Sequence, residues 1–379
     1  MQTLKPADRD YWKHIVQANN KFGVSLLAAI APHYATDNVL ISPTGIFLTL
    51  SMLYNGLSGM TYQKLQDALQ LPLPTEINPW NKQLLNYINL PKAGHEIHTG
   101  SALWFEDNVR CFEQFVREIM DVYGSQLYCI NFGSAEAVEQ IDYWAQTQTG
   151  EKITRVVDAQ GFNSKAKFAI SDLFYFYAQL DKAFSSDLLA GKQFYRVSGH
   201  PVPVDMMQVT ELFAYWEDAN SQCIKMPYRN SPYSLFLALP RPGANLGVCV
   251  GHLLAPANLF MGAGASPRPV HVELPRLDLS FCADLNRFLP NAGLGGLVSH
   301  VESNDFSLVA PDLSLGGFFH AAALKVNEIS DASPQLVPAY AGPAEFSMEF
   351  NRPFLLAVMD NNTGQVINAG AVLDPSLLA

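Results

Sequence analysis

The chain has 379 residues, of which 49% are hydrophobic and 16% are charged, and its formal net charge is −11 at pH 7. This acidic balance argues against nucleic acid or an anionic membrane as a partner, because both bind basic surfaces. The sequence has no apolar run long enough to span a bilayer, and its N-terminus lacks a basic-then-apolar signal. We therefore expect a cytoplasmic protein or a secreted one whose leader has been removed.

Helical patterns dominate the first part of the chain. Apolar residues at helical spacing predict an amphipathic helix over residues 8–30, with Pro32 just beyond its end. Ser42 and Pro43 open a second helix as N-cap and first helical residue. This second helix is apolar on nearly all sides, which marks it as buried. Further helices are expected over residues 61–69, 78–88, 113–122 and 134–148, the last of them capped by Ser134.

Strand patterns dominate the second part. The expected strands cover residues 96–104, 126–132, 168–176, 212–216, 223–226, 233–239, 270–274, 318–327 and 350–358. Short helices are expected over residues 251–259, 283–289 and 294–298, and residues 360–364 predict a hairpin turn. Helices that come first and antiparallel-looking strands that follow predict an α+β fold, which we expect to form a single domain over residues 1–379.

A long turn-forming segment separates the strands predicted over 318–327 and 350–358. It contains Pro334, Pro338, Gly342 and Pro343 and few residues that could anchor a core. Turn formers between apolar runs indicate an exposed loop, which we place at residues 329–349. Unstructured loops of this length are usually functional or disordered, and a solvated linker is the alternative.

The sequence lacks the common catalytic and metal-binding motifs. It has no G-x-S-x-G, H-E-x-x-H, P-loop or dinucleotide-binding motif, so we expect no enzyme activity. His95 and His98 would face opposite sides of a strand. No C-x-x-C pair occurs, so we expect neither a metal nor another cofactor. The cysteines are five, an odd number, and widely scattered: Cys111, Cys129, Cys223, Cys249 and Cys282.

Several segments together resemble the landmarks of the serpin family, in the family's order. The run F-N-R-P-F-L-L-A-V at 350–358 is similar to the C-terminal signature of serpins, and Asn327-Glu328 is similar to their hinge. The other matching segments are 38–43 with 52–56, 144–153, 204–207 and 274–276. The resemblance covers nearly the whole chain. It implies a fold of about eight or nine helices, a large central mixed sheet, two smaller sheets and an exposed reactive loop.

The resemblance also implies a mechanism. Serpins offer the exposed loop to a serine or cysteine protease, and the cut loop inserts into the main sheet as a new strand while the protease is still attached. Beneath the sheet, Ser42, Asp172 and His320 match gating positions. Asp172 stands where the family has Asn, and Gly45 stands where it has a second Ser. The implied hinge consists of Glu328, Ile329, Ser330, Asp331, Ala332, Ser333 and Pro334.

The hinge departs from the pattern of inhibitory serpins. Asp331 falls where the first inserting side chain enters the sheet, and burying an unpaired carboxylate is costly. Pro334 and Pro338 each remove a donor from the new ladder, and Ser330 replaces a flexible Gly. These changes predict a serpin that is non-inhibitory or weakly inhibitory. The alternatives are a working suicide inhibitor and a carrier of a small apolar ligand or chaperone-like binder.

The bond that proteases would cut lies between Tyr340 and Glu345. Counting from both ends of the loop gives different bonds within the set Tyr340, Ala341, Gly342, Pro343, Ala344 and Glu345. Tyr340 suits a chymotrypsin-like protease and Ala344 an elastase-like one, whereas the loop has no Arg or Lys for a trypsin-like one.

Residues 78–88 carry Lys82 as their only cation, so no heparin-binding surface is expected. We expect a monomer.

Overall fold

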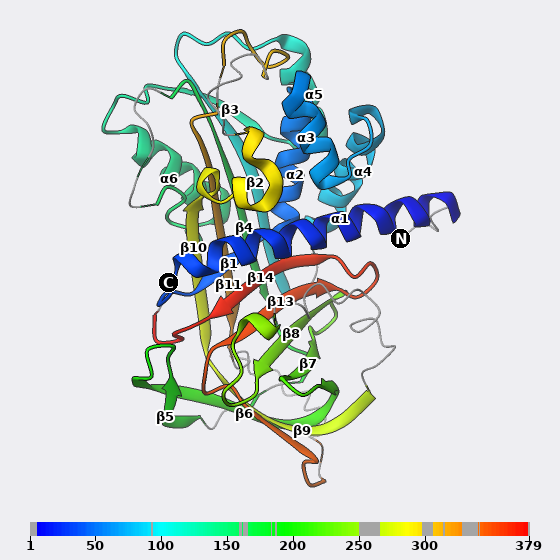
Figure 1. The fold of residues 1–379 in the computed structure, drawn as a ribbon, viewed down its shortest axis with the longest axis vertical. Helices are drawn as coiled ribbons and strands as arrows, with labels where there is room; N and C mark the ends of the chain where they lie inside the picture. Colours follow the sequence, from blue (N-terminus) through cyan, green and yellow to red (C-terminus); the bar gives the residue numbers. More distant parts are fainter. Residues whose placement is uncertain are drawn as a thin grey trace.

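The computed structural model describes residues 6–377 with the exception of 92–93, 159–160, 162–165, 183, 186–187, 250–265, 298–305, 314, 328–339 and 341. In these residues two β-sheets and a group of helices pack around a large apolar core (Figure 1). The α-helices are α1 (Pro6–Ile30), α2 (Pro43–Tyr54), α3 (Gly59–Leu69), α4 (Pro74–Ile88), α5 (Glu113–Tyr123) and α6 (Ala137–Thr149). Shorter helical segments are η1 (Ala31–His33), η2 (Leu285–Arg287), η3 (Pro290–Leu294) and η4 (Gly295–Leu297).

The helices of the first part lie close to their predicted positions. Ser42 caps α2 as expected: its Oγ accepts a 3.0 Å hydrogen bond from the Gly45 N–H, and Pro43 is the first helical residue. Every residue of α2 is buried. The predicted start of α6 is wrong, because the helix begins at Ala137. Ser134 instead accepts from the Glu136 N–H (3.2 Å) in the turn before the helix.

A five-stranded mixed sheet forms the centre of the molecule. Its strands, in spatial order, are β10 (Leu277–Asp284), β11 (Gly317–Val326), β4 (Phe168–Ala178), β2 (His95–Glu106) and β3 (Gln126–Ile130). The pairs β11–β4 and β2–β3 are parallel, whereas β10–β11 and β2–β4 are antiparallel. The predicted large mixed sheet is therefore present.

Both faces of this sheet are covered. Along β4, Phe174 joins the large core that contains α2, and its neighbours Leu173 and Tyr175 join a second apolar cluster with Ile141 and Trp144 of α6. The alternation follows from the strand period of two. Figure 1 shows α6 on the opposite side of the sheet from α2 and its neighbours. The middle of β4 is consequently shielded from water on both sides.

The remaining strands form one nine-stranded, hydrogen-bonded path. In spatial order they are β1 (Val39–Ile41), β14 (Val366–Val372), β13 (Phe354–Asp360), β8 (Tyr233–Pro240), β7 (Ser221–Pro227), β6 (Pro201–Glu217), β9 (Ser266–Pro275) and β12 (Phe346–Glu349), with β5 (Leu189–Tyr195) paired to β6. The long β6 joins two smaller groups of strands. Its start, from Pro201 to Met206, pairs with β5, its length from Met206 to Tyr215 pairs with β9, and its end pairs with β7.

Some element boundaries differ from the sequence prediction. The helix expected over 283–289 is wrong, since β10 continues to Asp284 and only Leu285–Arg287 forms a helical turn. The strand expected from residue 350 begins at Phe354, after Pro353, which has no N–H for a ladder. The last residues of the predicted loop form β12. The helix expected over 251–259 lies outside the described residues.

Three further findings concern the described parts of the chain only. None of their helices combines the length and the apolar character that crossing a membrane requires. Their His, Cys, Asp and Glu side chains nowhere gather in a group of three or more that could hold a metal ion. All five cysteines are free thiols.

Candidate functional site

The polar centre of the five-stranded sheet is a contact between neighbouring strands. His320 on β11 lies directly opposite Asp172 on β4 in the parallel register. The Asp172 carboxylate is hydrogen-bonded to Nδ1 of His320. On its other side, His320 Nε2 accepts a 3.0 Å hydrogen bond from the backbone N–H of Ser42. The structure therefore brings together Ser42, Asp172 and His320, and their role as a gate stays a prediction.

These contacts fix the position of the proton on His320. Nε2 accepts from Ser42, so the ring proton resides on Nδ1, where it is donated to Asp172. His320 is fully buried and Asp172 is 1% exposed, so both partners are desolvated together. Burial raises the pKa of Asp172 above its ordinary value, and the hydrogen bond and charge interaction with His320 act in the opposite direction. A carboxylate is kept in this interior because the imidazole N–H meets it.

Gly45 makes room for this carboxylate. A Cβ atom added at Gly45 would lie 2.8 Å from Asp172 Oδ2 and 3.3 Å from Ser42 Oγ. Both distances are shorter than an ordinary van der Waals contact, so a side chain at position 45 would push against the gate. The two departures from the family pattern, Gly45 and Asp172, therefore fit one another.

Ser42 also ties the gate to the nine-stranded sheet. Its Oγ donates a 2.7 Å hydrogen bond to the Ile367 carbonyl, and Thr44 Oγ1 donates a 2.8 Å bond to the Val366 carbonyl. Both acceptors lie on β14. The start of α2 thus connects the central strand β11 to the second sheet.

The predicted hinge and loop residues are only partly within the described chain. Glu328–Pro334 and Ala341 lie outside it, whereas Tyr340 and residues 342–345 lie inside. The Tyr340 N–H donates a 2.6 Å hydrogen bond to Glu211 Oε1 on β6. Near the other end of this segment, the Glu345 N–H donates to the Pro269 carbonyl (2.8 Å), and the Glu345 carboxylate pairs with Arg268 (3.2 Å). These residues contact the nine-stranded sheet and are not brought to the gate.

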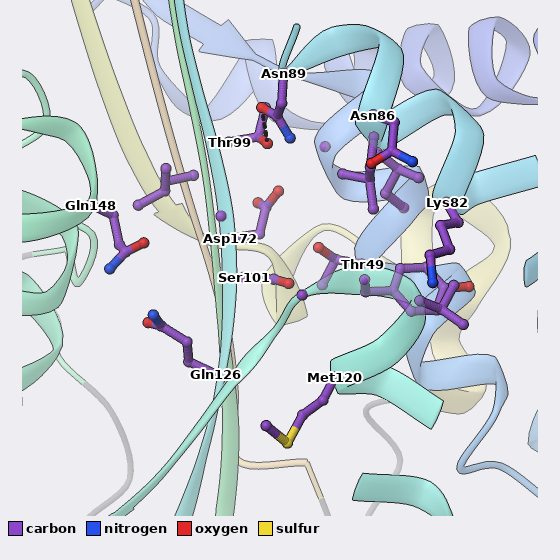
Figure 2. A pocket seen from close by; sticks show the side chains of 18 of the residues that line it. Thr49, Lys82, Asn86, Asn89, Thr99, Ser101, Met120, Gln126, Gln148 and Asp172 are labelled. Carbon is purple, nitrogen blue, oxygen red and sulfur yellow. Dashed lines mark hydrogen bonds between the residues drawn. The ribbon is translucent and has the colours of Figure 1, made fainter. Parts of the chain in front are cut away.

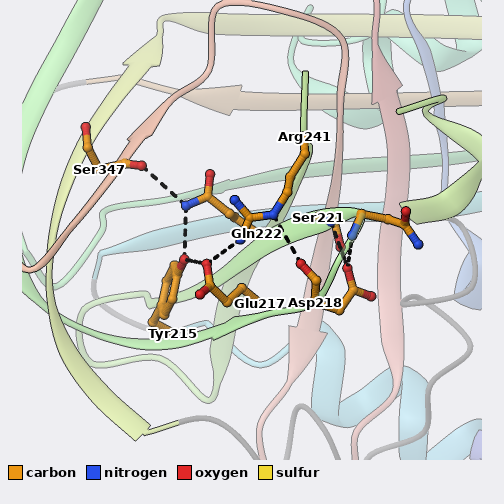
Figure 3. Close-up of polar contacts among 8 residues, drawn as sticks. Tyr215, Glu217, Asp218, Ser221, Gln222, Arg241 and Ser347 are labelled. Atoms are coloured by element: carbon orange, nitrogen blue, oxygen red, sulfur yellow. Dashed lines mark hydrogen bonds and ion pairs between the residues drawn. The ribbon is translucent and has the colours of Figure 1, made fainter. Parts of the chain in front are cut away.

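The strand that follows the loop, β12, is held by a polar network on β6 and β7 (Figure 3). Phe346 stacks on Tyr215, with ring centroids 4.3 Å apart. The Tyr215 hydroxyl donates to Glu217 (2.5 Å), which also binds Arg241 (2.6 Å). Gln222 donates to the Tyr215 hydroxyl (3.0 Å) and to the Ser347 carbonyl (3.4 Å). The C-terminal side of the loop is therefore anchored by both stacking and hydrogen bonds.

Sequence reasoning missed Glu211, Arg268 and Gln222. Glu211 left a detectable signal, because it occupies the buried phase of a strand in which Val209 and Phe213 are also buried. A charged residue at a strand position whose neighbours on the same face are apolar is expected to be buried with a polar partner. Arg268 and Gln222 left no such signal, since polar residues are ordinary on exposed strand positions.

A cavity of about 320 Å³ lies beside the gate (Figure 2). Its lining comes from the central sheet and from α2, α4, α5 and α6, and includes Thr49, Lys82, Asn86, Asn89, Thr99, Ser101, Met120, Gln126, Gln148 and Asp172. Sites for apolar ligands are lined mainly by hydrophobic and aromatic side chains. This lining mixes polar side chains with apolar ones such as Leu48, Leu85 and Leu173, so it does not single out an apolar ligand.

Comparison with known proteins agrees with this architecture. The family model described as "Serpin (serine protease inhibitor)" matches residues 17–375. Serine protease inhibitor 42Dd of Drosophila melanogaster is 26% identical over 91% of this chain and 94% of its own length. An uncharacterized serpin-like protein of Methanosarcina acetivorans is 25% identical over 95% of this chain and 86% of its own length.

The solved structures show the same fold. Arabidopsis AtSerpin1 in its native stressed conformation superposes with a TM-score of 0.86 and 19% identity, and the match covers 97% of this chain and 99% of that one. The family match spans nearly the whole sequence, and the described residues contain the five-stranded mixed sheet that the resemblance implied. The chain belongs to the serpin family, whose members are mostly serine protease inhibitors rather than enzymes.

Proposed function

We propose that this serpin presents its loop to serine proteases of chymotrypsin- or elastase-like specificity and is cut as a substrate, with little or no trapping of the protease. The observation that carries the proposal is the unbroken pairing of the neighbouring strands β4 and β11. We call the line along which these two strands meet the seam. These parallel strands pair continuously from Gly317 opposite Ala169 to Lys325 opposite Tyr177. A trapped protease requires the cut loop to enter between them.

The seam is buried on both of its faces. All residues of β11 from Gly317 to Leu324 are buried, as are those of β4 from Phe168 to Phe176. A strand inserted here would lie among desolvated neighbours and would have to satisfy their backbone groups. Pro334 and Pro338 supply no N–H for this purpose.

The end of the seam near Lys325 offers no free cation on β11 that could pair with the carboxylate of an inserted Asp331. Lys325 is the nearest cation on β11, and its Nζ already pairs with Asp278 on β10 (2.8 Å). A second carboxylate in this region would be repelled by Asp278 and would lose its own hydration. The hinge sequence and the packing of the seam therefore both oppose insertion.

The residues of the loop support the choice of protease. Tyr340 offers an aromatic side chain to a chymotrypsin-like pocket, and Ala344 offers a small one to an elastase-like pocket. The loop contains neither Arg nor Lys. Pro343, Ala344 and Glu345 are exposed, so a protease can approach this side of the loop.

The proposal is tested by incubation with chymotrypsin and with elastase, followed by denaturing gel electrophoresis. We expect rapid cleavage within residues 340–345 and no SDS-stable complex. The matched control is the triple variant Asp331→Thr, Pro334→Ala, Pro338→Ala, which removes one charge and restores two ladder donors. A stable complex formed in high yield by the wild-type protein would overturn the proposal and identify a working inhibitor.

We also propose that the chain acts as a single-domain monomer. The two apolar clusters lie on opposite faces of the same five-stranded sheet, so neither can unfold without exposing the other. Calorimetry should show one unfolding transition, and light scattering should give the mass of one chain. Two separated transitions or a dimer mass would contradict this proposal.

A further inference from the structure

Glu211 is a buried carboxylate on the buried face of β6, between apolar side chains. It is 6% exposed and lies between the buried residues Val209 and Phe213 on the same face of the strand. Carboxylates are rarely buried to this extent unless their oxygens have partners. The partners of Glu211 therefore indicate its role.

Both oxygens of Glu211 are engaged. Oε1 accepts the 2.6 Å hydrogen bond from the Tyr340 N–H of the loop. Oε2 accepts from the Leu212 N–H (3.3 Å) and lies 3.8 Å from Nζ of Lys182, in the segment that follows β4. If Tyr340 moved away, Oε1 would be left buried with no other partner among the described residues. The carboxylate therefore favours the docked position of Tyr340.

The side chain of Tyr340 is also held against the loop. A Cβ atom added at Gly342 would overlap the phenol group of Tyr340, so the ring packs over Gly342. A protease pocket that accepts an aromatic residue needs this ring to project away from the loop. In this arrangement neither the ring nor the main-chain N–H of Tyr340 is available to a protease.

We infer that Glu211 is a positioning residue that protects the bond on the carboxyl side of Tyr340 from proteolysis. The inference rests on the proposed function of the loop as a protease substrate. Proteases that bind substrates as an added strand pair with main-chain N–H groups of the substrate. Glu211 competes for one such N–H, so the loop must leave Glu211 before a chymotrypsin-like protease can cut after Tyr340.

The other candidate bond, Ala344–Glu345, provides an internal comparison. The Ala344 N–H makes no hydrogen bond to the described residues, and the segment is held from the Glu345 side by Pro269 and Arg268. Glu211 contacts neither Ala344 nor Glu345 through any of its described hydrogen bonds. Elastase cleavage after Ala344 should therefore be independent of Glu211.

The test compares cleavage rates in the full-length protein. Wild type, Glu211→Gln, Glu211→Ala and the control Glu273→Gln are treated separately with chymotrypsin and elastase, and cut sites are identified by mass spectrometry. Glu273 is a matched buried carboxylate on β9 whose side chain pairs with Lys192. We expect Glu211→Ala to raise the chymotrypsin rate at Tyr340 about tenfold, because a hydrogen bond to a charged group is lost. Glu211→Gln should raise it less, and no variant should change the elastase rate at Ala344.

Amide hydrogen exchange gives a readout that does not depend on a protease. The Tyr340 amide should exchange faster in both Glu211 variants than in wild type or Glu273→Gln. The inference would be overturned if wild type and Glu211→Gln had equal rates of cleavage after Tyr340 and equal rates of Tyr340 amide exchange. It would also be overturned if a Glu211 variant accelerated cleavage after Tyr340 and after Ala344 equally. Glu211→Gln keeps the shape of the side chain, so it gives a result even if Glu211→Ala fails to fold. The rate is measured as the disappearance of protein with an uncut loop, which counts both simple cleavage and trapping of the protease. An SDS-stable complex would therefore overturn the proposed function, and the effect of Glu211 on the rate could still be measured.

Discussion

The backbone N–H of Ser42 donates a 3.0 Å hydrogen bond to Nε2 of His320, which joins the start of α2 to the middle of β11. The other ring nitrogen of His320 is bound to Asp172 on β4. One side chain thus connects a buried helix to both strands of the seam that an inserting loop would have to open. Any separation of β4 from β11 must break or rearrange this chain of contacts.

Cutting the loop should leave the melting temperature of the wild-type protein almost unchanged. An inserting serpin becomes far more stable when cut, because the loop completes the sheet, whereas Asp331, Pro334 and Pro338 oppose that step. The triple variant Asp331→Thr, Pro334→Ala, Pro338→Ala should regain much of the increase. Thermal unfolding of cut and uncut protein, compared within each variant, measures the effect.

Comparison within each variant is needed because removing prolines also changes the unfolded chain and the uncut loop. A large rise in the melting temperature of the wild-type protein after cleavage at Tyr340 or Ala344 would show that its loop inserts.

Asp172→Asn should remove a pH-dependent part of the stability. Burial raises the pKa of Asp172, and His320 opposes this shift only in part. The raised pKa contributes stability that is fully present below the unfolded value of 3.8 and is lost as pH rises through the folded value. The free energy of unfolding of wild type, relative to Asp172→Asn, should therefore decline as pH rises from about 4.

Urea denaturation at a series of pH values measures this difference. Asp107→Asn is the matched control, because Asp107 is an exposed carboxylate in a turn. Parallel curves for wild type and Asp172→Asn across the whole range would contradict the prediction.

Gly45→Ala should destabilise the protein by about 1–3 kcal/mol, because the new methyl group would meet Asp172 Oδ2 at 2.8 Å in a packed interior. Part of this cost should disappear when Asp172 is replaced by Ala in the same protein. Chemical denaturation of the two single variants and the double variant gives the coupling free energy, which we expect to be about 1 kcal/mol or more. Additive effects would show that the two positions do not share the space.

Tyr215→Phe should weaken the attachment of β12. The change removes the hydroxyl that links Glu217 to Gln222 and keeps the ring that stacks on Phe346. Loss of these hydrogen bonds should lower the free energy of unfolding by about 1 kcal/mol and speed amide exchange in β12. Tyr195→Phe serves as the control, because Tyr195 is 50% exposed. Similar changes in both variants would argue against a specific role of the network.

Local sequence determined the helices and much of the family assignment. The Ser42-Pro43 pair followed by residues apolar on all sides specified a capped, buried helix, since capping and burial act within a few residues along the chain. The order of family segments likewise needed no coordinates. The hinge substitutions Asp331, Pro334 and Pro338 were also visible at once, because a proline lacks its N–H and an aspartate carries its charge in any fold.

Short strands and element ends were decided by pairing partners. β1 has three residues, and its pairing with β14 lies more than 300 positions away in the sequence. The segment 283–289 has an apolar content that suits a helix, but Ala283 and Asp284 pair with β11 instead. Whether such a segment becomes a strand or a helix depends on hydrogen-bond partners from distant parts of the chain, which a local sequence pattern does not contain.

The contacts of the site were decided by the tertiary structure alone. His320 could be recognised as a polar residue on an apolar strand, but its meeting with Asp172 depends on the parallel register of strands 148 positions apart. The contact of Glu211 with Tyr340 joins residues 129 positions apart and depends on where the loop returns to β6. Burial makes each of these polar groups require a partner, and only the folded chain determines which partner it finds.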